Sequence, residues 1–219
     1  LAKGNNEALV YLGDMYYNGN GYSKDTEKAL ALYQKGAEQG DARAEYIMGK
    51  FSESGEASVI EQNNDAAYSW FLKAAEKGHK GARLSLGYLC YKRDQLPNNQ
   101  TEAKKWFMLA AKEGNAEAQL FLGQIYLLEN NYQEALYWHE LAAHQKNPVA
   151  LYNLGYLHFN GLGTEKNRDK GIEFYTQAAY KGDVKAMSIL GNLFFDSNDS
   201  PKGVKWTLKA AIQGEALAQ

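Results

Sequence analysis

The chain of 219 residues lacks several features on which common functions depend. It has one cysteine, Cys90, which excludes an intrachain disulfide and a cysteine-rich zinc site. Neither charge is in excess, since 24 basic residues face 26 acidic ones, and this balance gives no electrostatic reason to expect nucleic acid as a partner. No apolar run reaches the roughly 18–20 residues that span a bilayer. With these features absent, the spacing of alanine and glycine is the strongest indication of fold and function.

Alanine and glycine recur along the chain at a nearly constant period. The alanines are Ala8, Ala44, Ala82, Ala118, Ala150, Ala186 and Ala218. Five residues after each of the first six comes a glycine, here termed the central glycine: Gly13, Gly49, Gly87, Gly123, Gly155 and Gly191. Such a period indicates one supersecondary unit stacked on copies of itself. Function is therefore expected on an extended surface.

Each unit is predicted to hold two helices joined by a turn. In the first unit, Asn5 is expected to cap a helix whose apolar stripe runs over Ala8–Tyr16, and Asn18–Gly21 has the composition of a turn. Asp25 then caps a second helix, which stops at Gly40. A central glycine costs roughly 0.5–1 kcal/mol relative to alanine in a helix interior, so we expect close approach of the two helices to offset it.

The other units repeat these signals. The second-helix caps are Asp25, Asn63, Asn99, Asn131, Asn167 and Asp199. The predicted stops are Gly40, Gly78, Gly114, Gly182 and Gly214, with Lys146 as the exception. The regularity predicts six consecutive helix pairs.

These residues resemble the Sel-one-like repeat family, a relative of the tetratricopeptide repeats. The first unit carries the family pattern as Leu12-Gly13, Tyr16, Gly19, Gly21, Lys28-Ala29, Tyr33, Ala37 and Gly40. The resemblance implies an all-α fold, a right-handed α/α solenoid (superhelix) of about six stacked helix-turn-helix repeats. It also implies an adaptor that holds other proteins, and a bacterial periplasmic or secreted location.

The predicted boundaries follow the repeat pattern as one continuous solenoid domain. They are 1–4 as the tail of a preceding repeat, then 5–40, 41–78, 79–114, 115–146, 147–182 and 183–214, and 215–219 as the start of a further repeat. Both ends resemble interior parts of a repeat, so we expect the chain to be a segment of a longer repeat protein. Repeats two and three depart from the pattern, with a longer loop over Ser54–Asn64 and Pro97 within Tyr91–Gln100.

The sequence offers no set of catalytic, cofactor-binding or metal-binding residues. The four histidines are His79, His139, His144 and His158, which are scattered over several repeats without metal-ligand spacing. Cys90 occupies a register that holds aromatic residues elsewhere, and is expected to be a packed thiol. No nucleophile with a base and an orienting group can be assembled from the spacing.

The candidate site is the face of the first helices that points away from the stripe packed inside each repeat. Counted from the central glycine, it comprises positions −6, −3, +1 and +4. It is rich in tyrosine, phenylalanine and leucine, which suit protein contacts. The predicted partner-binding residues are Tyr88, Tyr91, Tyr156 and Phe159, followed by Tyr17, Leu127, Tyr152 and Phe195. The competing interpretation is that these rings fill the space between adjacent first helices.

The favoured function is a non-enzymatic scaffold or adaptor that binds a partner peptide or protein segment on the concave face, without a cofactor, nucleic acid or a membrane span. One alternative is a cell-envelope protein that binds or hydrolyses glycans, since tyrosines can stack on sugar rings. Against it stands the lack of a recognisable carboxylate pair or activated serine. The other alternative is an architectural spacer in a larger repeat protein.

Overall fold

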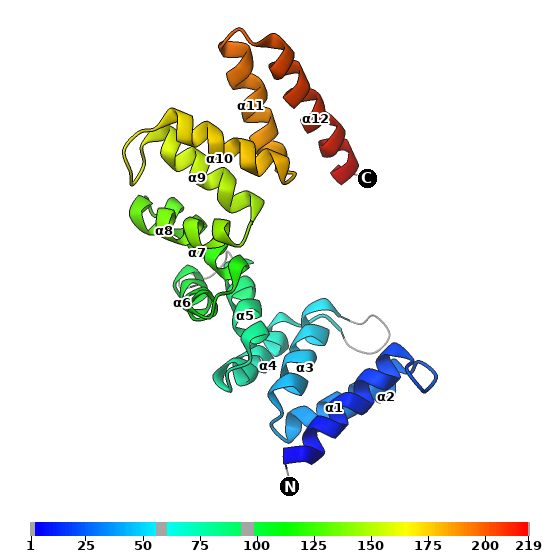
Figure 1. Cartoon of the computed structure of the whole chain (residues 1–219). Coiled ribbons are helices and arrows are strands. Elements are labelled where there is room, and N and C mark those ends of the chain that lie inside the picture. The colour runs from blue at the N-terminus through cyan, green and yellow to red at the C-terminus, as the bar shows by residue number, and fades with distance from the viewer. Residues whose placement is uncertain (1–2, 56–60, 93–98, 219) are drawn as a thin grey trace. The chain divides into compact units, whose positions relative to one another are not determined.

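The computed structural model describes residues 3–55, 61–92 and 99–218, which contain twelve α-helices and no strand (Figure 1). Of the two loops singled out in repeats two and three, residues 56–60 and 93–98 lie outside the described residues. The chain divides into two compact units, Leu1–Glu113 and Gly114–Gln219. Their boundary lies one residue before the junction predicted between repeats three and four. Each unit is described by itself below.

Both units consist of helix pairs. Unit 1 contains α1 (Lys3–Asn18), α2 (Thr26–Glu38), α3 (Ala42–Ser54), α4 (Asn64–Glu76), α5 (Lys80–Lys92) and α6 (Asn99–Lys112). Unit 2 contains α7 (Ala116–Leu128), α8 (Tyr132–His144), α9 (Pro148–Asn160), α10 (Arg168–Tyr180), α11 (Val184–Asp196) and α12 (Ser200–Ala218). Within each unit an odd-numbered helix packs on the even-numbered helix that follows, which in turn packs on the next odd-numbered helix. The predicted all-α helix-turn-helix repeat is confirmed.

Each central glycine lies directly against a side chain of the second helix. A Cβ atom added at Gly13, Gly49 or Gly155 would come within 2.4–2.6 Å of the ring of Tyr33, Phe71 or Tyr175. The equivalent neighbours of Gly87, Gly123 and Gly191 are Phe107, His139 and Thr207. The close helix approach expected from the sequence is therefore present in every repeat.

Helix caps explain most of the recurring Asp and Asn residues. Asp25, Asn63, Asn167 and Asp199 each accept a hydrogen bond from a backbone N–H in the first turn of the second helix, as predicted. Asn131 is a correction, because it stands at the cap position of α8 without a side-chain cap bond. Its ψ of 75° falls below the 93–101° of Asp25, Asn63 and Asn167, and the preceding Asn130 takes a left-handed φ of 57° in the short loop between Leu128 and Tyr132. The side chain of Asn99 lies outside the described residues.

The first helices also have capping residues. The sequence predicted a cap for the first of them alone, Asn5. The predicted cap Asn5 is wrong, because α1 already begins at Lys3 and Asn5 lies within it. Extending an existing helix adds a backbone hydrogen bond per residue without a nucleation cost, and no proline or left-handed residue interrupts this segment. The later first helices are capped by Asp41, Asn115, Asn147 and Asp183, and by His79, whose Nδ1 accepts from the Ala82 N–H at 3.2 Å.

The predicted helix stops are confirmed at four glycines, which take left-handed φ angles: Gly40, Gly78, Gly114 and Gly182. Lys146 adopts the same conformation with φ 66°, so the stop survives without glycine. Gly214 is a correction, since α12 continues through it to Ala218. Continuing an existing helix adds a backbone hydrogen bond per residue without a nucleation cost.

A lysine paired with a buried carboxylate of repeat two also holds the end of repeat one. Glu45, at the start of α3, is 2% exposed and pairs with Lys77 at 2.5 Å. The Lys77 ammonium also donates to the carbonyl of Gly40 at 2.9 Å. An analogous neutral bond joins Gln145 to Gln119 and to the carbonyl of Gly114 in unit 2. The side chains of Lys77 and Gln145 thus stabilise the helix stops at Gly40 and Gly114 by hydrogen bonds to their carbonyls.

Lys77→Ala is expected to lower the free energy of unfolding by about 2 kcal/mol, because it leaves the buried Glu45 carboxylate without its cation. Lys50→Ala removes the lysine of an exposed pair with Glu53 and is expected to change it by less than about 0.5 kcal/mol. Urea denaturation followed by circular dichroism compares the two variants. Equal losses would contradict the role given to Glu45 burial.

Candidate partner-binding surface

Position −3 of the first helices proves to be mostly covered. Val10 and Leu120, which the periodicity placed on the outward face, are 1% and 8% exposed and belong to the core. Tyr46, at the same position in α3, stacks on His79 at the start of α5, with ring centroids 4.4 Å apart. Val10 packs beside Gly36 of α2, and Leu120 packs with Ala142 of α8 and Ala150 of α9, so second helices contribute to this cover. The open part of the surface therefore lies at other positions.

In unit 1, α5 places Tyr88 and Tyr91 against one ring of α6. Both tyrosines are half-buried, and their centroids lie 5.6 Å and 6.4 Å from that of Phe107, in edge-on arrangements. Phe107 is itself fully buried under Gly87. The two predicted residues are thus brought together, each with part of its surface on the repeat core and part at the molecular surface.

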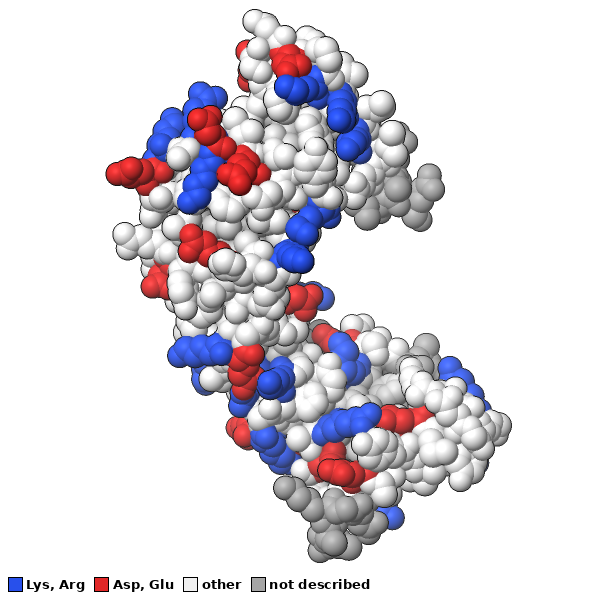
Figure 2. All heavy atoms as spheres, viewed as in Figure 1, with Lys and Arg blue, Asp and Glu red and all other residues white. Residues whose placement is uncertain are grey.

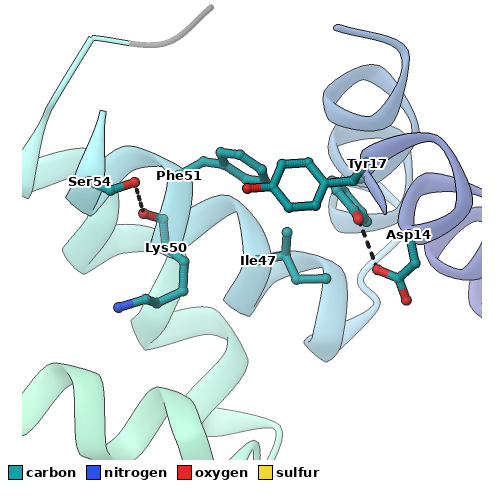
Figure 3. A pocket seen from close by; sticks show the side chains of 7 residues that line it. Asp14, Tyr17, Ile47, Lys50, Phe51 and Ser54 are labelled. Atoms are coloured by element: carbon teal, nitrogen blue, oxygen red, sulfur yellow. Dashed lines mark hydrogen bonds between the residues drawn. The ribbon is translucent and has the colours of Figure 1, made fainter. Parts of the chain in front are cut away.

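Tyr17 borders a cavity of about 290 Å³ between α1 and α3 (Figure 3). Its ring meets Phe51 edge-on at 5.5 Å, and Ile47 completes the apolar part of the lining. Asp14, Lys50 and Ser54 supply polar groups. A volume of this size is near the lower end for small-molecule sites and suits one or two inserted side chains.

The polar groups of this cavity are held by neighbours within unit 1. Asp14 accepts a hydrogen bond from the Tyr33 hydroxyl at 2.8 Å and from the Arg43 guanidinium at 2.6 Å. Burial, together with the nearby Asp14 carboxylate, raises the pKa of Tyr33, which keeps this hydroxyl protonated as a donor. Lys50 pairs with Glu53 in the same helix. The cavity therefore presents a fixed polar border around aromatic and aliphatic walls.

In unit 2, α9 carries three of the predicted residues. Tyr156 is 40% exposed, whereas Tyr152 and Phe159 are half-buried, with centroids 5.7 Å and 6.2 Å from that of Tyr175. The Arg168 guanidinium lies 4.8 Å from the centroid of Phe159. Tyr156 is thus the ring of this group that offers the largest exposed fraction.

A second cavity, of about 360 Å³, lies beside Tyr152. Its lining comes from α7, α9 and α11 or the turn before α11, and includes Gln124, Val149, Val184 and Lys185. Burial raises the pKa of Tyr152, with Asp183 as a further cause. The arrangement matches that of unit 1, with apolar walls and a few polar groups between successive first helices.

The two remaining predicted residues lie at helix ends in unit 2. Leu127 is half-buried near the end of α7. Phe195 is 41% exposed, and its ring lies over Gly203 of α12, where an added Cβ would approach it to 2.8 Å. Phe195 therefore also contributes to packing of its own repeat.

Ile47, Val184 and Lys185 line these cavities but were not among the residues predicted from the sequence. Ile47 stands at position −2, three residues before Lys50 at position +1, so helical spacing could have found it. Val184 and Lys185 begin α11, and their place depends on how one repeat meets the next. The sequence period alone does not give that relation.

The histidines and the cysteine are accounted for by packing or exposure. His139 and His158 are buried, His79 is half-buried as a cap, and His144 is exposed. Cys90 is 4% exposed, which confirms the predicted packed thiol. Within the described residues, no three His, Cys, Asp or Glu side chains are grouped so that they could hold a metal ion. None of the helices in the described part of the chain combines the length and apolar character needed to cross a membrane.

Charge is mixed on the visible surface. Basic and acidic side chains are interspersed on the visible face of each unit (Figure 2). Several form close pairs, such as Lys28 with Asp25 and Arg43 with Asp14. Contact through shape and aromatic area is favoured over attraction by one dominant charge.

In each of the six helix pairs, the central glycine of the first helix lies against a side chain of the second helix. This repeated arrangement defines an α-helical repeat solenoid. The sequence profile of the Sel1 repeat matches residues 6–41, 42–79, 82–115, 116–147, 148–183 and 184–215. The chain belongs to the Sel1 repeat family. No curated protein matches the chain.

Solved structures share this fold. The protective antigen c5321 of uropathogenic Escherichia coli is 27% identical with a TM-score of 0.77, over 95% of this chain and 48% of its own. The chain thus spans about half the length of c5321. A Sel1 repeat protein from Oxalobacter formigenes is 26% identical with a TM-score of 0.75, over 94% of this chain and 87% of its own. PilF of Pseudomonas aeruginosa, at 16% identity and a TM-score of 0.67 over 93% and 89%, shares the fold.

Proposed function

We propose that the first-helix faces of this chain bind a segment of a partner protein. Sel1 repeat proteins generally mediate protein–protein interaction. The observation that supports the proposal here is that two of the surface cavities, about 290 Å³ in unit 1 and about 360 Å³ in unit 2, lie between successive first helices and are bordered by the predicted residues Tyr17 and Tyr152. Aromatic and aliphatic walls with a few polar groups suit side chains of an inserted peptide or loop.

A non-enzymatic role is supported by the way the reactive side chains are used. The Sel1 repeat fold is generally non-catalytic. His139 and His158 are enclosed in packing, and the thiol of Cys90 is buried. The carboxylate of Asp14 is occupied by Tyr33 and Arg43. These four groups thus have structural roles among the described residues, which supports a binding protein.

Tyr156 is the position of choice for finding the partner. A photo-crosslinking amino acid at position 156 of the full-length protein in its own host should crosslink one defined protein segment. The same group at position 137, an exposed tyrosine of the second helix α8, should not crosslink that segment. Crosslinks of equal yield at both positions would contradict a binding surface on the first helices.

Tyr156→Ala is expected to weaken binding of the crosslinked segment by about tenfold or more, because an exposed aromatic side chain at the centre of an interface often contributes that much. Tyr137→Ala is the matched control and should leave the affinity unchanged. Fluorescence anisotropy with the labelled segment measures both. Tyr88 and Phe159 are less suitable, since both also pack on their own repeats, and their removal would combine folding and binding effects.

A further inference from the structure

A further cavity of unit 2 lies between two successive second helices. Its volume is about 360 Å³, and α8, α9 and α10 all contribute to its lining. Leu151 and Leu154 of α9 and Phe174 of α10 supply apolar walls, whereas Glu140 of α8 and Gln177 of α10 are exposed polar members of the lining. Helical spacing places the two leucines on a different face of α9 from the residues of the candidate partner-binding surface. The cavity is therefore separate from that surface, and we term it the α8–α10 cleft.

The α8–α10 cleft carries a carboxylate that the other repeats lack at this position. Glu140 is the ninth residue after the cap position of its second helix, and it is exposed. The same position in the other repeats holds Gln34, Leu72, Met108, Thr176 and Leu208. Glu140 forms no ion pair with another residue that the structure describes. An unpaired carboxylate thus lies beside apolar walls.

The opposite wall of the cleft lacks a lysine that other repeats supply from the chain itself. In α4 the ammonium of Lys73 lies 4.3 Å from the ring centroid of Trp70. The same pair recurs in α12 as Trp206 and Lys209, at 5.0 Å. The corresponding residues of α10 are Phe174 and Gln177, a smaller ring and a neutral side chain. The cleft therefore has room for an aliphatic chain with a cationic end, which the repeat itself provides elsewhere.

The charge beside the α8–α10 cleft is negative in balance. Gln177 donates a hydrogen bond to Glu173 at 3.3 Å, which adds a second carboxylate on this side of α10. The Lys170 ammonium lies 5.8 Å from the ring centroid of Phe174 and does not pair with Glu140. Two carboxylates are thus set against one ammonium group. This balance favours a cationic occupant over a neutral or an anionic one.

We propose that the α8–α10 cleft binds a lysine side chain of a partner protein. The methylene groups of the lysine lie along Leu151, Leu154 and Phe174, and its ammonium group pairs with Glu140. A flexible stem with a compact charge suits an apolar cavity that has one carboxylate at its edge. This contact goes beyond the partner segment proposed for the first helices and does not depend on it.

Two small probes test the chemistry of the cleft. Nα-acetyl-lysine methylamide carries the proposed side chain, and the norleucine derivative has a similar aliphatic stem without the ammonium group. Methyl NMR of the full chain at about pH 7.5, above the ordinary pKa of histidine, follows both titrations. The lysine derivative should shift the methyl resonances of Leu151 and Leu154 and bind about fivefold more tightly than the norleucine derivative. Equal affinities, or no shift at these leucines, would overturn the proposal.

Three variants assign the preference to the cleft. Glu140→Gln should remove the preference for lysine, whereas Glu134→Gln, which removes another exposed carboxylate of α8, should preserve it. Gln177→Lys restores the lysine that α4 has at this place and should abolish binding of the lysine derivative, because the new ammonium competes for Glu140. An unchanged preference in Glu140→Gln, or unchanged binding in Gln177→Lys, would contradict the assignment. Tighter binding of butylammonium than of the lysine derivative would indicate a free amine and overturn a protein side chain as the occupant.

Discussion

Gly49→Ala is expected to lower the free energy of unfolding by roughly 3 kcal/mol, the upper part of the range for overpacked cores. An added Cβ would lie 2.4 Å from Cδ1 of Phe71, closer than non-bonded carbon atoms approach. Phe71 is fully buried and also packs near Tyr46, with centroids 5.8 Å apart, so its ring has little room to move. The helices α3 and α4 would have to separate.

A decrease in the free energy of unfolding distinguishes steric overpacking from the effect of helix propensity, which has the opposite sign. Gly→Ala inside a helix ordinarily stabilises by about 0.5–1 kcal/mol. Gly214→Ala is the matched control, because Gly214 lies within α12 and the nearest atom to an added Cβ is Cγ1 of Val184 at 4.0 Å. Urea denaturation should show Gly214→Ala stabilised and Gly49→Ala destabilised. In the double variant Gly49→Ala/Phe71→Leu, part of the lost stability should be recovered. Equal changes in the free energy of unfolding for Gly49→Ala and Gly214→Ala would contradict the packing explanation.

The close approach of the two helices at each central glycine could be predicted from the sequence because the sequence repeats. Central glycines five residues after an alanine could be aligned, and an interior glycine is tolerated where a neighbouring helix needs the space. The second helices were equally readable, since Asp25, Asn63 and Asn167 cap helices through local hydrogen bonds. Features determined by a few neighbouring residues were therefore predicted well.

The candidate surface was less predictable, because its exposure depends on how successive repeats meet. Periodicity assigned Val10 and Tyr156 to the same face, yet Val10 is 1% exposed and Tyr156 is 40% exposed. Tyr46 is covered by His79, a residue 33 positions later that acts as a cap. A helical wheel gives the direction of a side chain from one helix axis and contains no information about the neighbouring helix.

Acidification is expected to destabilise unit 2 through His139. This histidine takes the place of the rings of Tyr33 and Phe71 under a central glycine, and it is 0% exposed. Among the described residues neither of its ring nitrogens has a hydrogen-bond partner. Burial lowers the pKa of His139 to about 4, from an ordinary value of 6.5. The folded state therefore favours neutral imidazole, whereas the unfolded chain binds a proton near the ordinary pKa.

The direction of the pH effect follows from which state binds more protons. Below about pH 6.5 the unfolded chain binds the proton more tightly, so stability falls as the pH decreases towards about 4, by about 3 kcal/mol in all. Above that window His139 is neutral in both states and contributes no slope. His79 and His158 act in the same direction, because burial lowers the pKa of each.

His139→Phe separates the buried ring from the other titrating groups. Phe107 fills the equivalent place under Gly87, so phenylalanine should fit under Gly123 and keep the repeat folded. Urea denaturation at about pH 7 and about pH 4.5 should show a smaller loss for His139→Phe than for the unaltered chain, by about 2 kcal/mol. His144→Phe replaces an exposed histidine by the same residue and serves as the matched control. An unchanged acid loss in His139→Phe would assign the effect to His79, His158 or the carboxylates, because a residue that no longer titrates cannot contribute to the difference in proton binding.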